Sequence, residues 1–303
     1  MCPTCRSAPL EITHTASAND ERLLDGMLGC EACGASFPVL DGIPVLVPDP
    51  RSFLAQNVLL AVARDLPEPL AAWIGEASGQ NSAWDANRQH LSSYGHDHYG
   101  PEGGRATALL EAARPPGGGL ALDLGCGPGA ATHALAKDHE LVLGLDLHLG
   151  LLRLAHQVLR SGVARFPVRE LGVRYRPVDR RIGLEHPERV DFWCCDASTL
   201  PLADGVANTA ISMNLVDCVP SPPLHLEELG RVLAPGGHAV LATPFDWAPH
   251  VTPQSAWLDP DGLVAALPES LAVSSRQDHP WGVYVHGRRT SRYDALLLGL
   301  RKV

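Results

Sequence analysis

The sequence has no apolar run of the length, about 20 residues, that a membrane-spanning helix needs. Its richest apolar stretch, residues 141–155, is interrupted by Asp146, His148 and Arg153. It also lacks the basic segment followed by an apolar one that marks a secretory signal near an N-terminus. We therefore expect a chain with no membrane association, residing in the reducing cytoplasm.

Positive charge is also scarce. The 303 residues include 24 Lys and Arg against 34 Asp and Glu, which gives a formal net charge of −10. Phosphate binding needs clustered positive charge, so this balance disfavours a general nucleic-acid-binding role. Hydrophobic residues make up 45% of the chain, enough for a sizeable core, and the length suits one large domain with an appendage.

Four of the eight cysteines lie near the N-terminus, in two C-x-x-C pairs. These pairs are Cys2 with Cys5 and Cys30 with Cys33. Each pair can present two thiolates to one tetrahedral ion. The alternatives are two disulfides, which a reducing compartment disfavours, or thiols without a role. The polar stretch between the pairs cannot build a core, a deficit that a bound metal offsets. We predict a structural Zn²⁺ held by these four thiolates.

Short β-type runs follow the second pair and predict a hairpin over residues 34–48. The cysteine pairs, Phe37-Pro38-Val39 and residues 41–46 together resemble the small zinc-ribbon proteins that partner RNA and protein methyltransferases. The resemblance implies a ribbon that stabilises or docks a methyltransferase and does no chemistry itself. Residues 1–50 carry two basic and seven acidic side chains, which suits docking better than binding of nucleic acid.

The rest of the chain divides into a linker and a main domain. Apolar residues recur at helical spacing from Phe53 to Leu66 and predict a linker helix that ends at Pro67 and Pro69. Residues 114–119 are a Pro- and Gly-rich breaker before the main pattern. The predicted organisation is a zinc ribbon over 1–50, a helical linker and active-site lid over 51–104, and a main domain over 105–303 with a basic insert at 162–190.

The main domain opens with a strand, a glycine turn and a helix. An apolar strand over residues 120–124 runs into Gly125, Gly127 and Gly129, and a helix follows from Ala130. Missing Cβ atoms let the backbone approach a ligand closely, and a helix N-terminus favours negative charge. The next apolar strand ends in Asp146, where a carboxylate is placed to accept hydrogen bonds from ribose hydroxyls.

The spacing of Gly125, Gly127 and Ala130 also fits a dinucleotide fingerprint, so a hydride-transfer enzyme is an alternative. Three further features stand against it: Asp123 precedes the turn, a third strand ends in Asp196-Ala197, and residues 231–237 precede another apolar strand. In this order the features resemble the class I S-adenosylmethionine-dependent methyltransferases, over about residues 105–303. The resemblance implies an α/β fold with a doubly wound, mostly parallel, seven-stranded Rossmann-like sheet.

It also implies how the cofactor would lie. Asp123 would be near its methionine end, Asp146 would hold the ribose hydroxyls, and Asp196 would take the adenine amino group. Asn214, at the end of the fourth strand, would line the methyl-transfer side. The complete cofactor set is Asp123, Gly125, Cys126, Gly127, Gly129, Asp146, Leu147, Asp196, Ala197 and Asn214.

Two regions depart from a minimal methyltransferase. Residues 157–190 contain eight Arg and four acidic residues. They predict a hairpin that is either a solvated surface element or a cap whose arginines meet an anionic group. The second region, after the fifth strand, holds Trp247 and Trp257, which either face a flat or cationic substrate or anchor the core.

Several segments are similar, in order, to the methyltransferase domain of ovothiol-biosynthesis enzymes, which methylate an imidazole nitrogen of a thiol-bearing histidine. They are Tyr94 to Gly100, the basic insert, Asn214 to Asp217, Thr243 to Trp257 and Pro280 to Asp294. This resemblance implies N-methylation of a small nitrogen-containing metabolite. The substrate-side candidates that it implies are Tyr94, His98, Tyr99, Asn214, Asp217 and Trp247.

Two alternatives remain. An rRNA or tRNA base methyltransferase with a zinc-ribbon recognition domain is favoured by the ribbon and the basic insert, but opposed by the acidic charge of the chain. A cofactor-binding protein without catalysis would serve a partner through its ribbon. A small-molecule substrate is therefore the expected partner, with S-adenosylmethionine and structural Zn²⁺ as the expected cofactors.

Overall fold

A computed structural model describes residues 1–19, 22–63, 65–101 and 105–303. In these residues a group of strands comes first, a group of helices follows, and strands are interspersed with helices from residue 120 on. The strands are β1 (Glu11–Ala18), β2 (Leu23–Gly29), β3 (Ser36–Leu40), β4 (Ile43–Leu46), β5 (Leu120–Leu124), β6 (Leu141–Asp146), β7 (Val163–Leu171), β8 (Arg174–Arg181), β9 (Val190–Cys195), β10 (Ala207–Met213), β11 (Leu233–Thr243), β12 (Leu271–His286) and β13 (Arg289–Lys302). The helices are α1 (Pro50–Gln56), α2 (Val58–Val62), α3 (Glu68–Ser78), α4 (Ala83–Tyr99), α5 (Arg105–Ala113), α6 (Ala130–Leu135), α7 (Leu149–Ser161), α8 (Pro222–Val232) and α9 (Pro260–Ala265). Within the described ranges, no helix is long and apolar enough to cross a membrane.

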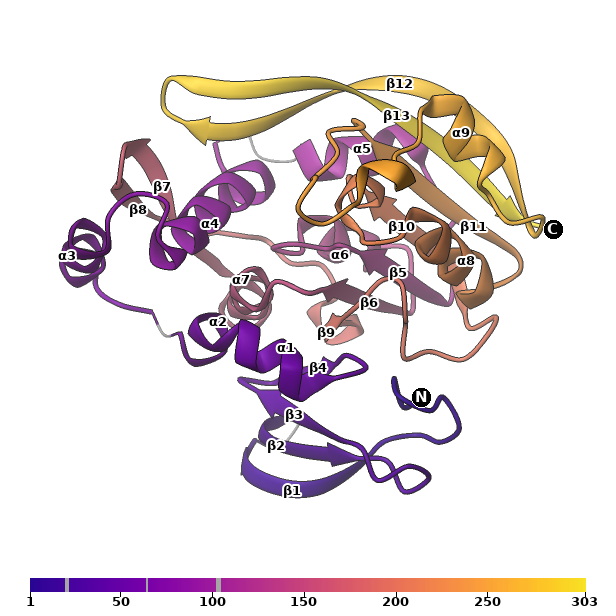
Figure 1. Ribbon diagram of the computed structural model, residues 1–303, viewed down its shortest axis with the longest axis horizontal. Coiled ribbons are helices and arrows are strands. Elements are labelled where there is room, and N and C mark those ends of the chain that lie inside the picture. The colour runs from indigo at the N-terminus through magenta and orange to yellow at the C-terminus, as the bar shows by residue number, and fades with distance from the viewer. Residues whose placement is uncertain (20–21, 64, 102–104) are drawn as a thin grey trace.

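One mixed sheet of 11 strands organises the molecule (Figure 1). Its order is β1-β2-β3-β4-β9-β6-β5-β10-β11-β13-β12, while β7 and β8 form a separate hairpin. The strands from β4 to β11 in this order are parallel neighbours, and β13 lies antiparallel between β11 and β12. Helices cover both faces, as a parallel sheet requires.

The prediction of a seven-stranded sheet is therefore wrong for the sheet as a whole. Seven strands come from residues 120–302, and four more come from residues 11–46. The two parts join where β4 pairs in parallel with β9, with Val45 opposite Cys194 and Leu46 opposite Cys195. This pairing covers an edge that would otherwise expose unpaired backbone groups.

Alternate residues of the central strands bury their side chains on opposite faces of the sheet. Leu122 of β5 belongs to the same apolar cluster as Leu226 of α8. Its neighbour Ala121 belongs to the cluster that holds Leu135 of α6 and Leu152 of α7. The fold is thus a three-layer α/β arrangement, with the central strands buried between two helical layers.

The N-terminal strands β1 to β3 continue the sheet at the lower edge of the view in Figure 1. The hairpin predicted after Cys33 is confirmed as β3 and β4. Phe37 is fully buried, in the same apolar cluster as Cys195 of β9. Arg22 binds Asp191 at the start of β9, with 2.7 Å between Nη1 and Oδ1. The described part of residues 1–46, called the ribbon region from here on, therefore packs on β9 of its own chain.

The segment between ribbon and main domain differs from its prediction. Three short helices, α1, α2 and α3, replace one linker helix. Pro67 and Pro69 begin α3 rather than end a helix, in keeping with the preference for proline in a first turn. The 17-residue helix α4 was not predicted, because its buried face is largely polar.

Polar contacts with distant segments hold helix α4 in place. Tyr175 of β8 donates its hydroxyl hydrogen bond to the buried carboxylate of Asp85, at 2.7 Å. The backbone N–H of Arg169 in β7 donates to the hydroxyl of Ser92, also at 2.7 Å. Because buried polar groups need partners, the hairpin β7–β8 and helix α4 specify each other's position.

The buried side chain of Phe37 tests whether the ribbon region and the main domain share one core. We expect Phe37→Ala to lower the free energy of unfolding by about 3–5 kcal/mol, because it leaves a cavity in that core. The Ile12→Ala control, at a residue 61% exposed on β1, should change it by less than about 0.5 kcal/mol. Urea unfolding followed by circular dichroism measures both, and a loss below about 1 kcal/mol for Phe37→Ala contradicts a shared core.

Candidate functional site

A cavity of about 500 Å³ opens at the carboxyl ends of strands β5, β6, β9 and β10. Helix α4 and the long hairpin β12–β13 contribute the opposite wall. This volume is typical of small-molecule and cofactor sites, and open α/β sheets bind ligands at this edge.

Nine of the ten residues predicted to hold a cofactor line this cavity. They are Asp123, Gly125, Cys126, Gly127, Asp146, Leu147, Asp196, Ala197 and Asn214. Gly129 does not reach the wall of the cavity. A Cβ at Gly129 would lie 2.6 Å from Cζ of Phe192, and φ there is +87°. This glycine therefore permits close packing of α6 on the sheet rather than approach of a ligand.

Two residues of helix α4 hold the glycine loop, residues 125–129, and the first residue of α6. The hydroxyl of Tyr99 donates to the carbonyl of Pro128 at 2.6 Å, and its ring is buried away from the cavity. Nδ1 of His98 accepts from the N–H of Ala130 at 3.2 Å. Tyr99 therefore anchors the loop and does not line the cavity, whereas His98 both anchors the loop and lines the cavity.

The carboxylate of Asp146 fixes the same loop from the sheet. Its Oδ2 accepts from the N–H of Gly127 at 2.9 Å, and its Oδ1 accepts from the N–H of His148 at 2.7 Å. Burial raises the pKa of Asp146, and these two hydrogen bonds act against that rise. One side chain thus joins the glycine loop to the start of α7.

Asp123, at the end of β5, is 1% exposed. Its Oδ2 accepts a hydrogen bond from the hydroxyl of Thr132 at 2.7 Å. Burial, with the nearby carboxylate of Asp146 as a further contribution, raises the pKa of Asp123 to about 7. A positive charge brought into the cavity would favour its ionised form.

The buried side chain of His225 holds the segment that follows β9. Asp196 caps this turn, accepting from the N–H of Ser198 at 2.8 Å. Nδ1 of His225 lies 3.2 Å from the carbonyl of Ala197, and Nε2 lies 2.8 Å from the hydroxyl of Ser212. Because a carbonyl only accepts, Nδ1 carries the proton and Nε2 accepts from Ser212.

Four of the six predicted substrate-side residues line the cavity: Tyr94, His98, Asn214 and Asp217. Trp247 does not. Its ring stacks on Trp257, with 6.2 Å between ring centroids and 12° between planes. Nε1 of Trp257 donates to the carbonyl of Thr252 at 3.0 Å, so the pair stabilises the loop after β11.

Several residues of the cavity wall were not predicted. Helix α4 adds His90 and Asp97, and the spacing of His90, Tyr94 and His98 on one helical face was the signal that could have identified them. The loop after β11 adds Asp246, which accepts from the hydroxyl of Tyr293 of β13 at 2.8 Å. Other unpredicted lining residues include His148, Cys218 and Trp281.

The predicted hairpin is confirmed as β7–β8, but its arginines do not reach this cavity. None of the hairpin's arginines lines it in the described part of the chain. Arg165 pairs with Asp179 at 3.0 Å on the surface, and Arg169 binds Gln89 of α4 at 2.9 Å. A third, Arg180, binds backbone carbonyls at the end of α4. The arginines thus hold the hairpin and α4 together rather than cap the cleft.

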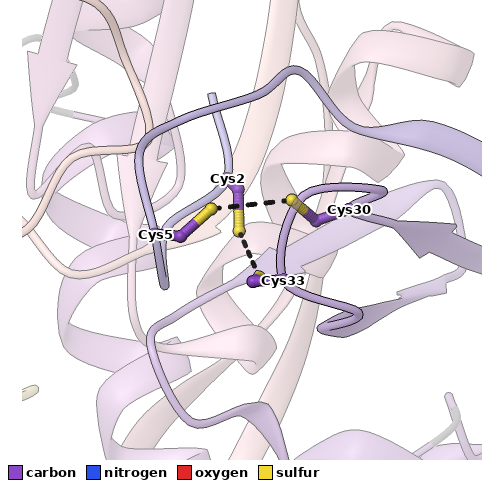
Figure 2. Close-up of side chains that lie close together, drawn as sticks. All are labelled: Cys2, Cys5, Cys30 and Cys33. Atoms are coloured by element: carbon purple, nitrogen blue, oxygen red, sulfur yellow. Dashed lines mark hydrogen bonds between the residues drawn. The ribbon is translucent and has the colours of Figure 1, made fainter.

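A second candidate site lies in the ribbon region. Figure 2 shows the side chains of Cys2, Cys5, Cys30 and Cys33 converging from two turns. Their sulfur atoms all lie within 4.8 Å of one another. Sγ of Cys2 is 3.7 Å from that of Cys33, and Sγ of Cys5 is 3.7 Å from that of Cys30. Four bonds of 2.3 Å at tetrahedral angles would separate the sulfurs by about 3.8 Å, so this donor set fits a structural Zn²⁺.

The cysteine turns lie against the segment that follows Asp196. Cys2 and Cys30 are buried in the same apolar cluster as Leu200. Nη1 of Arg6, just after the first pair, lies 3.2 Å from Oε1 of Glu228 in α8. Glu228 also accepts from the N–H of Leu200 at 2.8 Å. The ribbon therefore supports one wall of the cavity from the outside.

Residues 122–241 match the family model described as "Methyltransferase domain". This range runs from β5 to β11 and contains the glycine loop, Asp146, Asp196 and Asn214. We therefore identify it as a class I S-adenosylmethionine-dependent methyltransferase domain.

Two curated relatives each match 40% of the chain. The biotin biosynthesis bifunctional protein BioHC of Cellvibrio japonicus is 30% identical over 122 residues, which are 40% of this chain and 19% of that protein. The ubiquinone biosynthesis O-methyltransferase of Leptothrix cholodnii is 29% identical over 123 residues, 40% of this chain and 43% of that protein. The chain thus spans less than half the length of either relative.

Among solved structures, the chain is similar to one described as "Conversion of a Disulfide Bond into a Thioacetal Group during Echinomycin Biosynthesis". The identity is 20% and the TM-score 0.48, over 65% of this chain and 81% of that chain.

The cysteine cluster makes a direct analytical prediction. Natively purified protein should contain about one Zn²⁺ per chain, released by a thiol-modifying reagent, because four thiolates complete a closed tetrahedral site. Cys30→Ser should lose the metal, whereas the control Cys218→Ser, outside the cluster, should keep it. Elemental analysis measures both, and metal-free native protein would rule out the zinc assignment.

Proposed function

We propose that the chain transfers a methyl group from S-adenosylmethionine to a nitrogen atom of a small metabolite, and that a structural Zn²⁺ stabilises its ribbon. One observation carries the proposal. Asp123, Asp146 and Asp196 come from the ends of three neighbouring strands and line one cavity together with Gly125 and Gly127. Had these carboxylates faced different sides of the sheet, no single ligand could have met all three.

The residues of the cavity fit a cofactor with a ribose, an adenine and a cationic end. Each carboxylate oxygen of Asp146 already accepts one backbone N–H and retains a second lone pair for a ribose hydroxyl. Asp196, with Ala197 beside it, would take the adenine amino group. Asp123 would face the methionine end, where positive charge would favour its carboxylate form.

The chain's part in the reaction would be alignment. The cofactor supplies an activated methyl group, and transfer by in-line attack gains most from holding the reacting atoms in position. Burial lowers the pKa of His98 to about 3, and Nδ1 of His98 accepts from the N–H of Ala130. His98 is therefore a poor base near neutral pH. A nitrogen with a free lone pair needs no base to attack.

The nature of the acceptor is supported by four of the segments that resemble ovothiol methyltransferases. All but the basic insert contribute side chains to the cavity. These are Tyr94 from the segment 94–100, Asp217 from 214–217, Asp246 from 243–257 and Trp281 from 280–294. We propose an imidazole nitrogen of a thiol-bearing histidine derivative as the acceptor. The alternative of an RNA substrate gains no support, because no Lys or Arg lines the cavity in the described part of the chain.

Asp146 provides the first test of the cofactor site. We expect Asp146→Asn to weaken binding of S-adenosylhomocysteine by about 10- to 100-fold, through loss of charge-assisted hydrogen bonds to the ribose. The amide oxygen can still accept one backbone N–H, so circular dichroism should show a folded chain. The matched control Asp138→Asn, at an exposed residue after α6, should bind normally in calorimetric titrations. Normal affinity in Asp146→Asn would reject the ribose role.

Asp123 predicts a pH dependence of cofactor binding. Its pKa is about 7 without ligand, and a cationic cofactor would lower it. Affinity for S-adenosylmethionine should therefore rise with pH, by up to about tenfold per unit between about pH 5 and 7, and level off above. His90 and His148 do not titrate in this window, because burial lowers the pKa of each to about 4. Calorimetry across this range should show the rise in the native chain and a smaller slope in Asp123→Asn, and equal slopes would refute the role of Asp123.

A further inference from the structure

The cavity is far more acidic than a cofactor of this kind requires. Six aspartates line it, and no Lys or Arg does so in the described part of the chain. Its histidines add no positive charge near neutral pH, because burial lowers the pKa of His90 and His148 to about 4 and that of His98 to about 3. The wall is therefore negative or neutral throughout.

The six carboxylates divide into two groups of three. Asp123, Asp146 and Asp196 stand at the ends of β5, β6 and β9, where the proposed cofactor would lie. The other three come from helix α4, from the turn after β10 and from the loop after β11. They are Asp97, Asp217 and Asp246. These three carboxylates lie outside the set that the proposed cofactor would contact.

Asp217, in the second group, is buried and has one carboxylate oxygen without a hydrogen-bond donor among the described residues. The residue is 2% exposed, and its Oδ2 accepts from the N–H of Asp246 at 2.9 Å. Burial raises the pKa of Asp217, and the nearby hydroxyl of Thr243 acts against that rise. Oδ1 of Asp217 has no hydrogen-bond partner of ordinary geometry among the described residues. A buried acceptor without a donor is costly.

A second buried acceptor without a donor lies three residues earlier. Oδ1 of Asn214 likewise has no partner among the described residues, and its backbone is held at a φ of +55°. Both residues line the cavity. Two acceptors on one turn call for a ligand that brings N–H donors.

Aromatic rings complete this side of the cavity. Tyr94, Trp281 and Tyr293 line it, and the hydroxyl of Tyr293 holds Asp246 at 2.8 Å. Tyr94 is close enough to Asp217 and Cys218 for their charges to help raise the pKa of its hydroxyl beyond the effect of burial. Aromatic faces attract cations, most strongly where water is excluded.

We propose that the methyl acceptor carries a cationic nitrogen group, an ammonium or an amidinium, and that Asp217 binds it together with Asp246 beside the ring of Tyr94. This inference rests on the proposed function and adds the charge of the substrate to it. The cationic group is a handle and not the methylated atom, because a protonated amine has no lone pair with which to attack. The acceptor must therefore hold a separate neutral nucleophile.

Histamine and imidazole-4-acetate provide matched probes, because both carry an imidazole and differ in the charge of the side chain. With the protein saturated with S-adenosylhomocysteine, calorimetry should show histamine binding at least about tenfold more tightly than imidazole-4-acetate. Asp217→Asn should weaken histamine binding by about 10- to 100-fold, and Asp246→Asn by less, since Asp246 is exposed. The affinity of both variants for S-adenosylhomocysteine should stay within about twofold of the native value.

The outcomes separate the two proposals. Failure to bind S-adenosylhomocysteine overturns the proposed function. If S-adenosylhomocysteine binds normally, three results would overturn this inference alone: histamine does not bind, imidazole-4-acetate binds as tightly as histamine, or Asp217→Asn binds histamine like the exposed control Asp138→Asn. Should Asp217→Asn fail to fold, Asp246→Asn decides by the same comparison, with an unchanged histamine affinity counting against the inference.

Discussion

The carboxylate of Asp146 is the interaction on which the shape of the cleft depends. By accepting the N–H groups of Gly127 and His148, it sets the distance between the glycine loop and the end of β6. Helix α4 holds the opposite side of that loop through His98 and Tyr99. A loop of glycines has little conformational preference of its own, so these polar contacts supply the order that a ligand would otherwise have to impose.

The ribbon region supports the neighbouring wall. Pairing of β4 with β9 makes the N-terminal strands part of the main sheet, and the cysteine turns pack beside Leu200, in the segment that follows Asp196. Arg6 and Arg231 both contact Glu228, whose carboxylate holds the N–H of Leu200. A region without a large core of its own thus contributes order beside Asp196, the residue that we propose to bind the adenine.

The sequence predicted the parts of the site that sit at strand ends, because glycines and carboxylates there follow a short and regular pattern, as Asp146 and Asp196 do. Helix α4 has no such pattern in its sequence and was not predicted. Its buried residues are largely polar. Ser92 and Asp85 find their partners in β7 and β8, which are 77 and 90 positions further along the chain. The prediction of seven strands was too small for a similar reason, because no local sequence pattern indicates that β4 pairs with β9.

Charge counted along the chain was the least informative guide to the site. The basic insert suggested a cap for an anion, yet Arg169 and Arg180 bind groups of α4 and its end, and the cavity wall carries aspartates without a lining arginine in the described ranges. An arginine bound to carbonyls and amides serves the fold, while a single aspartate with an unpaired buried oxygen can decide what binds. The segment that looked cationic in sequence therefore positions a helix whose other face lines an anionic cleft.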